Sequence, residues 1–254
     1  MEHKREDGMF AGHLKDLAER SWQSSQYTFT NFLDEAQISD LYSLEHELAY
    51  AGLVLFGGVE HADRCVARFG REEDLGYSQP FPITCLKVDP VVEKFGENLS
   101  HRDYLGALMS LGVERDLLGD IYVQGKTAYV FCLDHIADYI RDNLCSVRHT
   151  SVRVIPLEEI PEMVGPVLET KIIIAASERL DAVIAQVYNI SRSQSLSLFS
   201  QGKVFLNGKQ VLNTSVSCHS EDKISVRGYG KFIYDGQTGT TGKGRSRIQV
   251  RVYV

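Results

Sequence analysis

The feature that most constrains this sequence is a run of two short helical patterns followed by a hairpin signal, between Ser177 and Phe232. The first pattern has the i, i+3, i+4, i+7 and i+8 spacing of an amphipathic helix, with apolar side chains at Leu180, Val183, Ile184, Val187 and Tyr188. Two helices this short and a small hairpin make only a weak core by themselves.

Local signals set the ends of the second helix and of the strands after it. Ser191 and Gln194 have the spacing of a capping box at its start, and Gly202 is expected to end it in a left-handed conformation. Asn207-Gly208 predicts a two-residue hairpin turn. The expected strands are residues 203–206 and 223–227, and a glycine-spaced loop is expected at residues 228–232.

Charge is distributed unevenly along the 254 residues, although the net charge is −7. Residues 171–254 hold 12 Lys and Arg against 5 Asp and Glu, whereas the rest of the chain holds 15 against 29. The basic end coincides with the helix–hairpin module, which favours a polyanionic partner there. The acidic part is expected to contact protein or to lie away from that polyanion.

Before this module, the patterns predict two further domains. Helices at 8–23 and 34–51, separated by a loop at 23–30, and strands at 53–56 and 65–69 indicate a small N-terminal α/β unit, residues 1–76. Residues 77–160 show the order β-α-β-β-α-β of a ferredoxin-like fold. RNA-recognition modules of this fold carry aromatic residues on the middle strands. Tyr122, Tyr129 and Phe131 are candidates for that role, although aromatic residues of the core are the favoured interpretation.

A proline-containing acidic segment precedes the basic module, and we place a linker at residues 161–176. The module then occupies residues 177–254. Its glycine-rich residues 235–244 predict a mobile loop, and residues 245–254 a strand with alternating faces. One face, with Arg247, Gln249, Arg251 and Tyr253, is either part of a basic binding surface or an ordinary solvated face.

Several motifs carry a family resemblance. RLD, SRSQ, GKVFLNGK and DKISVRGYGKF resemble the S4 RNA-binding domain, and NFLDEAQ, FGGVEHADR, NLSHRDYLGALMSLGVERDLLGDI and VFCLDHIADYI extend the resemblance to the bacterial YlmH family. The resemblance implies an α+β protein that binds RNA without known catalysis. It also implies association with the large ribosomal subunit, where relatives hold tRNA on stalled, split ribosomes, and a link to cell division. The second helix, SQSLSLFSQ, lacks the Lys or Arg that many S4 domains carry there.

The sequence gives little support to catalysis. It has no phosphate-binding or nucleophile motif at a strand–helix junction. Pseudouridine synthases carry a catalytic R-L-D, but Arg179-Leu180-Asp181 lies inside the S4 helix, where Asp181 is expected to hold the module's own backbone or to pair with a nearby base. The His and Cys residues lack zinc-site spacing, and the five cysteines lack a C-x-x-C pair. We therefore expect no metal, cofactor or disulfide.

We predict a non-catalytic, cytoplasmic, monomeric protein that binds large-subunit rRNA and tRNA on the 50S subunit. No apolar run approaches the roughly 18 residues of a membrane span. The alternatives are an rRNA- or tRNA-modifying enzyme with an S4 specificity arm and a division scaffold. Arg192 lies in the first turn of its helix, where free N–H groups suit a phosphate. The predicted RNA-binding residues are Arg179, Arg192, Ser193, Gln194, Lys203, Asn207, Lys209, Arg227, Lys231, Arg245 and Arg247.

Overall fold

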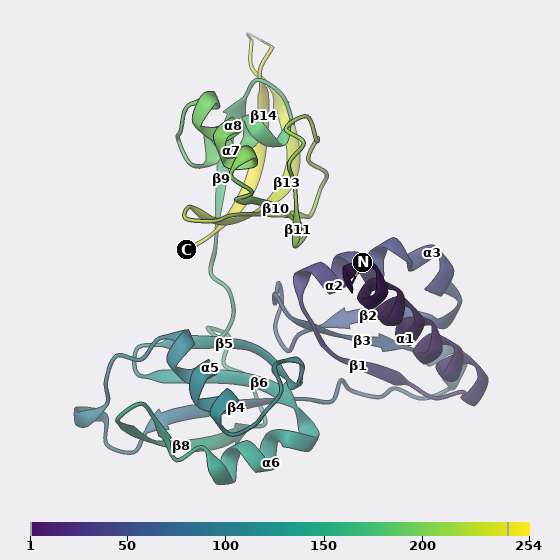
Figure 1. Cartoon of the computed structure of the whole chain (residues 1–254), viewed down its shortest axis with the longest axis vertical. Helices are drawn as coiled ribbons and strands as arrows, with labels where there is room; N and C mark the ends of the chain where they lie inside the picture. The colour runs from purple at the N-terminus through teal and green to yellow at the C-terminus, as the bar shows by residue number, and fades with distance from the viewer. Residues whose placement is uncertain (1, 243) are drawn as a thin grey trace. The chain divides into compact units, whose positions relative to one another are not determined.

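The computed structural model describes residues 2–242 and 244–254, with side chains from Gly8 onward, and the chain divides into two compact units (Figure 1). The first unit holds the residues up to Asp34 and Asp40–Pro166; the second holds Glu35–Ser39 and Val167–Val254. The strands form three separate sheets, and helices lie between them in the chain, which confirms the α+β class.

The N-terminal part of the first unit contains a three-stranded antiparallel sheet of order β1-β3-β2. The predicted helix at 34–51 is broken near Leu44. The Leu44 backbone N–H donates its hydrogen bond to the carbonyl of Leu41, three residues earlier rather than four. The predicted loop at 23–30 is shorter than expected, because strand β1 begins at Thr28. The elements are α1 (Glu2–Ser24), β1 (Thr28–Leu33), α2 (Glu35–Ser43), α3 (Glu45–Leu48), η1 (Ala49–Ala51), β2 (Leu53–Phe56), β3 (Cys65–Phe69) and α4 (Glu72–Leu75).

The middle part is a five-stranded antiparallel sheet of order β5-β6-β4-β8-β7, which has the strand order of a ferredoxin-like fold with one short extra edge strand. Helices α5 and α6 pack on one face, and a capping box of Ser100 and Asp103 begins α5. The elements are β4 (Ile83–Pro90), η2 (Glu93–Phe95), α5 (His101–Ser110), η3 (Arg115–Leu117), β5 (Leu118–Gln124), β6 (Thr127–Leu133), α6 (Asp134–Asn143), β7 (Ser146–Val147) and β8 (Thr150–Leu157).

The other face of this sheet is covered by residues of the N-terminal part. Phe131 shares a buried apolar cluster with Phe32 and Val66. Gly119 permits this close packing, because a Cβ there would lie 2.7 Å from the Phe32 ring. The segments predicted as separate domains, 1–76 and 77–160, therefore pack together within one compact unit.

The second unit is a six-stranded antiparallel sheet of order β11-β10-β12-β13-β14-β9, with helices α7 and α8 on one face (Figure 1). Val183 and Ile184 of α7 and Phe199 of α8 pack against Phe232 and Ile248 of the sheet. The elements are β9 (Leu168–Ala175), α7 (Leu180–Val187), α8 (Arg192–Ser200), β10 (Val204–Leu206), β11 (Lys209–Gln210), β12 (Asp222–Val226), β13 (Gly230–Thr240) and β14 (Ser246–Tyr253).

Two segments of the second unit differ from the sequence prediction. The second half of the predicted linker at 161–176 is strand β9, which pairs with β14 from Leu168 to Ala175. The predicted loop at 235–244 is strand as far as Thr240, and Lys243 lies outside the described residues. The register shifts around Gly236 and Gly239 explain the error, because glycines that suggest a loop also accommodate β-bulges.

Candidate nucleic-acid interface

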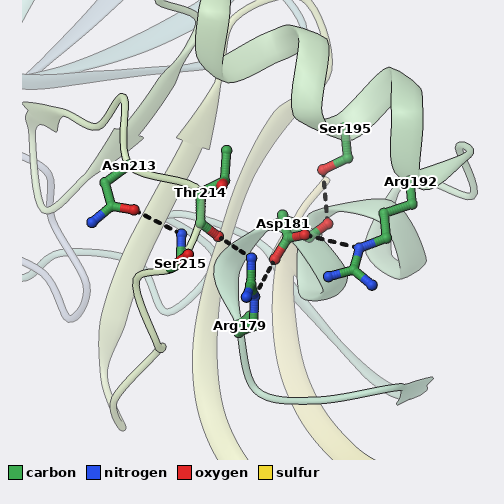
Figure 2. Close-up of polar contacts among 7 residues, drawn as sticks. All are labelled: Arg179, Asp181, Arg192, Ser195, Asn213, Thr214 and Ser215. Carbon is green, nitrogen blue, oxygen red and sulfur yellow. Dashed lines mark hydrogen bonds and ion pairs between the residues drawn. The ribbon is translucent and has the colours of Figure 1, made fainter.

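A buried carboxylate holds two arginine side chains where helices α7 and α8 begin (Figure 2). Arg179 Nε lies 3.0 Å from Asp181 Oδ1, and Arg192 Nε lies 3.0 Å from Asp181 Oδ2. The Asp181 side chain is 0% exposed, whereas those of Arg179 and Arg192 are 38% and 57% exposed. Each guanidinium is therefore held on its inner side and keeps N–H groups toward solvent.

The local sequence explains this geometry. Arg179 is the extended residue before α7, and Asp181 lies in the first turn, where a carboxylate is favourable beside the positive helix end. Ser195 Oγ of α8 donates a 2.7 Å hydrogen bond to the Asp181 backbone carbonyl and joins the two helices. Arg179 also donates to the Thr214 carbonyl at 3.3 Å. Asp181 thus acts within the module, as predicted for an R-L-D sequence inside this helix.

Figure 2 also shows how the loop before β12 supports Arg179. The Asn213 side chain accepts a 2.9 Å hydrogen bond from the Ser215 backbone N–H, and Thr214 lies between them. This turn presents the Thr214 carbonyl to the guanidinium. The sequence patterns did not reveal the roles of this loop and of Ser195. The bond from Arg179 to the Thr214 carbonyl and the bond from Ser195 to the Asp181 carbonyl both depend on tertiary packing.

The three uncharged residues predicted to contact RNA make hydrogen bonds within the fold. Gln194 Oε1 accepts from the Ser191 backbone N–H at 2.9 Å, which confirms the capping box, and the Ser193 hydroxyl lies 3.0 Å from that of Ser191. The amide of Asn207 donates to Asp222 at 2.8 Å and accepts from a backbone N–H of β12. Since both amides support local structure, we leave Gln194 and Asn207 out of the surface proposed below.

The predicted cations fall into two groups. Within the described chain, one group forms no ion pair with a carboxylate; it comprises Lys203, Arg227, Arg245 and Arg247. The other group forms ion pairs with carboxylates and includes the two arginines on Asp181. It also includes Lys231, whose side chain is only 18% exposed and whose Nζ lies 3.3 Å from Oε2 of Glu35 in the second unit. Lys209 is exposed on strand β11. The surface therefore retains free positive charge on β10–β14 as well as at the helices.

The face of the last strand that holds Arg247, Gln249, Arg251 and Tyr253 was left open between a basic binding surface and an ordinary solvated face. Arg251 pairs with Asp235 and Glu221, each at 2.6 Å, and Gln249 donates to Asp235 at 2.9 Å. These contacts compensate the charge of Arg251 and limit the free positive charge of the face to the Arg247 end.

The aromatic residues of the middle sheet belong to the core. Phe131 is 0% and Tyr129 is 7% exposed, and Tyr122 donates a 3.1 Å hydrogen bond to Asp120. The interpretation as core aromatics is confirmed for Phe131 and Tyr129. An RNA base could not stack on these rings without separating the packed parts of the first unit.

Sequence reasoning did not anticipate a set of charges between the two parts of the first unit. Arg64 donates to the backbone carbonyls of Leu118 and Phe32 at 2.9 Å and of Arg115 at 3.3 Å. Burial lowers the pKa of the Arg64 guanidinium and that of the Arg115 guanidinium. Repulsion by Arg64 is a smaller cause of the lowered pKa of Arg115. Burial also raises the pKa of Asp120, reinforced by a neighbouring carboxylate. These residues come from FGGVEHADR and ERDLLGD, so the two motifs meet in space.

Among the side chains of residues 8–242 and 244–254, no group of three or more His, Cys, Asp or Glu is placed to hold a metal ion. No helix in the described part of the chain has the length and apolar character needed to cross a bilayer.

Comparison with known proteins gives matches across both units. The family described as "Putative RNA-binding domain in YlmH" matches residues 78–160. The "Ribosome-associated protein quality control protein P2" of Bacillus subtilis (strain 168) is 28% identical over 221 residues, 86% of this chain and 84% of the relative. The solved structure "Cell division protein ylmH from Streptococcus pneumoniae" has 18% identity and a TM-score of 0.50, covering 60% of this chain and 91% of that one. At this identity the comparison with the solved structure shows similarity of fold only.

Proposed function

Because the chain belongs to the YlmH family, we propose that it is a non-catalytic RNA-binding protein of the large ribosomal subunit. Structured rRNA and tRNA are its ligands, and its role is in ribosome-associated quality control in the cytoplasm. The name of the Bacillus subtilis relative supports the ribosomal role. The observation that carries the proposal is the pair of arginines held on buried Asp181, in a unit whose described residues include further cations without a carboxylate partner.

The arginine pair favours phosphate binding because its geometry is set before the ligand arrives. Arg192 uses Nε for Asp181, so its terminal nitrogens remain to donate to phosphate oxygens in the planar arrangement that suits them. The start of α8 contributes free backbone N–H groups beside it. Such contacts read the position of phosphates rather than base sequence.

The proposed phosphate ligands extend from the helices onto the sheet. They are Arg179, Arg192, Lys203, Arg227, Arg245 and Arg247. Each phosphate contact lowers the slope of log affinity against log salt by about 0.7 to 0.9, so contacts from this whole set give a slope of about −4 to −5. A steep slope therefore distinguishes RNA binding by this surface from a scaffold role of the acidic part.

The test is binding of the full chain to tRNA, and to purified large subunits by sedimentation, over a range of salt concentrations. Arg192→Ala and the pair Arg245→Ala/Arg247→Ala should each weaken binding and flatten the slope, by about 0.7 to 0.9 per contact removed. Lys171→Ala is the matched control, because Lys171 is an exposed cation of the same unit that pairs with Glu169 at 3.0 Å. Unchanged slopes in the arginine variants, or absence from large subunits, would refute the proposal.

The modifying-enzyme alternative has its own readout. Incubation of the protein with unmodified rRNA and tRNA, followed by mass spectrometry of the nucleosides, should show no new modified nucleoside. A product that depends on Asp181 would favour the enzyme instead.

A further inference from the structure

We propose that Tyr229 is a stacking platform for an unpaired RNA base. This inference rests on the proposed RNA-binding function and adds the kind of RNA feature recognised. Phosphate contacts hold RNA without regard to pairing, whereas a stacking platform selects a base that lies outside a duplex.

The position of Tyr229 suits a stacking ring. It lies in the tight turn between β12 and β13, where its backbone N–H donates to the Val226 carbonyl at 2.9 Å. Glycines flank it on both sides, with φ of +87° at residue 228 and +131° at residue 230, so neither adjacent residue has a side chain that could cover the ring. The side chain is 45% exposed.

The ring is also supported from below. Its centroid lies 5.4 Å from that of Tyr188, which in turn lies 5.9 Å from that of Phe232, a residue that is 0% exposed. Three aromatic rings therefore connect the core of the second unit to the surface. A ring held in this way loses little further freedom when a base stacks on it.

The Tyr188 hydroxyl gives a second, independent indication of a ligand. It is buried and, among the described residues, has no hydrogen-bond partner, which is rare in folded proteins because the lost hydration is not replaced. It lies beneath the turn, where a Cβ built on Gly230 would be 3.8 Å away. A polar base edge that enters beside Tyr229 would supply the missing partner.

Cations surround the same turn. Arg227 is exposed, its guanidinium lies 4.6 Å from the Phe205 ring centroid, and its backbone N–H donates to the Lys203 carbonyl at 2.9 Å. Neither Arg227 nor Lys203 has a carboxylate partner in the described structure. Exposed aromatic rings beside unpaired cations are the combination that binds single-stranded RNA, whereas an apolar protein segment would leave these charges without a partner.

The two parts of the surface are close enough to contact one RNA. Asp181 and Tyr188 lie at opposite ends of α7, about 10 Å apart along the axis at a rise of about 1.5 Å per residue. The arginine pair would bind the backbone of a stem, and Tyr229 would receive a base from the adjoining loop.

The experiment compares a stem-loop RNA with a fully paired duplex of the same stem, using the full chain and the variants Tyr229→Ala and Tyr229→Phe. Tyr229→Ala should weaken stem-loop binding about 5- to 150-fold, the effect of losing one base–aromatic stack. It should leave duplex binding and both salt slopes unchanged. Tyr229→Phe should bind like the unmodified protein. Leu212→Ala, which truncates another exposed apolar residue of this unit, should have no effect.

A fluorescent base supplies the second measurement. 2-Aminopurine in the loop should be quenched on binding to the unmodified protein and to Tyr229→Phe, but not to Tyr229→Ala. Equal stem-loop affinity of Tyr229→Ala and the unmodified protein would overturn the inference, as would an equal loss on both RNAs. If Arg192→Ala still flattens the slope in that case, the proposed function stands without the stacking site. If the unmodified protein binds neither RNA, the proposed function itself fails.

Discussion

Because Arg179 and Arg192 share one buried carboxylate, we predict that mutations of the two arginines have strongly non-additive effects on stability. Replacing Arg179 or Arg192 by Met keeps aliphatic bulk over Asp181 and removes one charged partner. Each single variant leaves the carboxylate with one guanidinium at 3.0 Å. The double variant leaves a side chain that is 0% exposed with no cation.

The magnitudes follow from exposure. A hydrogen bond to a charged group contributes about 1.5–3 kcal/mol net, and partial exposure of both arginines reduces this, so each single change should cost about 1 kcal/mol. An uncompensated buried charge costs about 3–5 kcal/mol. The double variant should therefore lose about 1–3 kcal/mol more than the sum of the single variants, a coupling typical of residues in one network.

Hydrogen exchange with mass spectrometry on the full chain is the appropriate assay, because a chain of two units is not expected to unfold in one step. Peptides from α7 and α8 report the free energy of opening of the second unit. Adding Asp181→Asn to the double variant should recover stability, because a neutral amide is less costly to bury than an unpaired charge. Additive losses without recovery would show that the carboxylate does not depend on these two partners.

Three further predictions concern the first unit. Arg64→Lys should cost about 2–3 kcal/mol in urea unfolding followed by circular dichroism, because one ammonium cannot reach all three carbonyls that the guanidinium bonds; an unchanged midpoint would contradict this. The Ser100 backbone N–H and hydroxyl lower the pKa of Asp103, so its contribution to α5 is present above the unfolded pKa of about 3.9 and is lost as pH falls through the lower folded pKa. Asp103→Asn should flatten the acid side of a circular-dichroism pH titration; an unaltered curve would argue against the cap. Gly119→Ala would place a Cβ 2.7 Å from the Phe32 ring and should cost about 1–3 kcal/mol in thermal unfolding, a loss that should be absent for the open site Gly106→Ser.

Sequence patterns predicted the structure best where the signal and its partner are a few residues apart. The Ser191–Gln194 capping box spans three residues, and the Asn207-Gly208 turn needs only the positive φ values of 48° and 75° that these residue types accept. The strands predicted at residues 53–56 and 65–69 are β2 and β3 with the same bounds.

The patterns failed where the partner is distant. Strand β9 pairs with β14, far later in the chain, so nothing near residues 168–175 showed that this segment was a strand of the module. The same limit applies to the site. The contact of Arg179 with Asp181 is local, but that of Arg192 depends on how α8 packs on α7. Buried Arg64 bonds carbonyls of Phe32, Arg115 and Leu118, which only the tertiary fold brings together.

The pairing of β9 with β14 also has a consequence for synthesis of the protein. Strand β9 leaves the translating ribosome first among the strands of its sheet, yet its neighbour β14 is made after all the others. Until then β9 has no partner in the sheet, and the exposed side chains of Ile172 and Ile174 lie on an unpaired strand. The unit that carries the arginine pair is therefore completed late, and a nascent chain that stalls before residue 246 would carry an incomplete sheet.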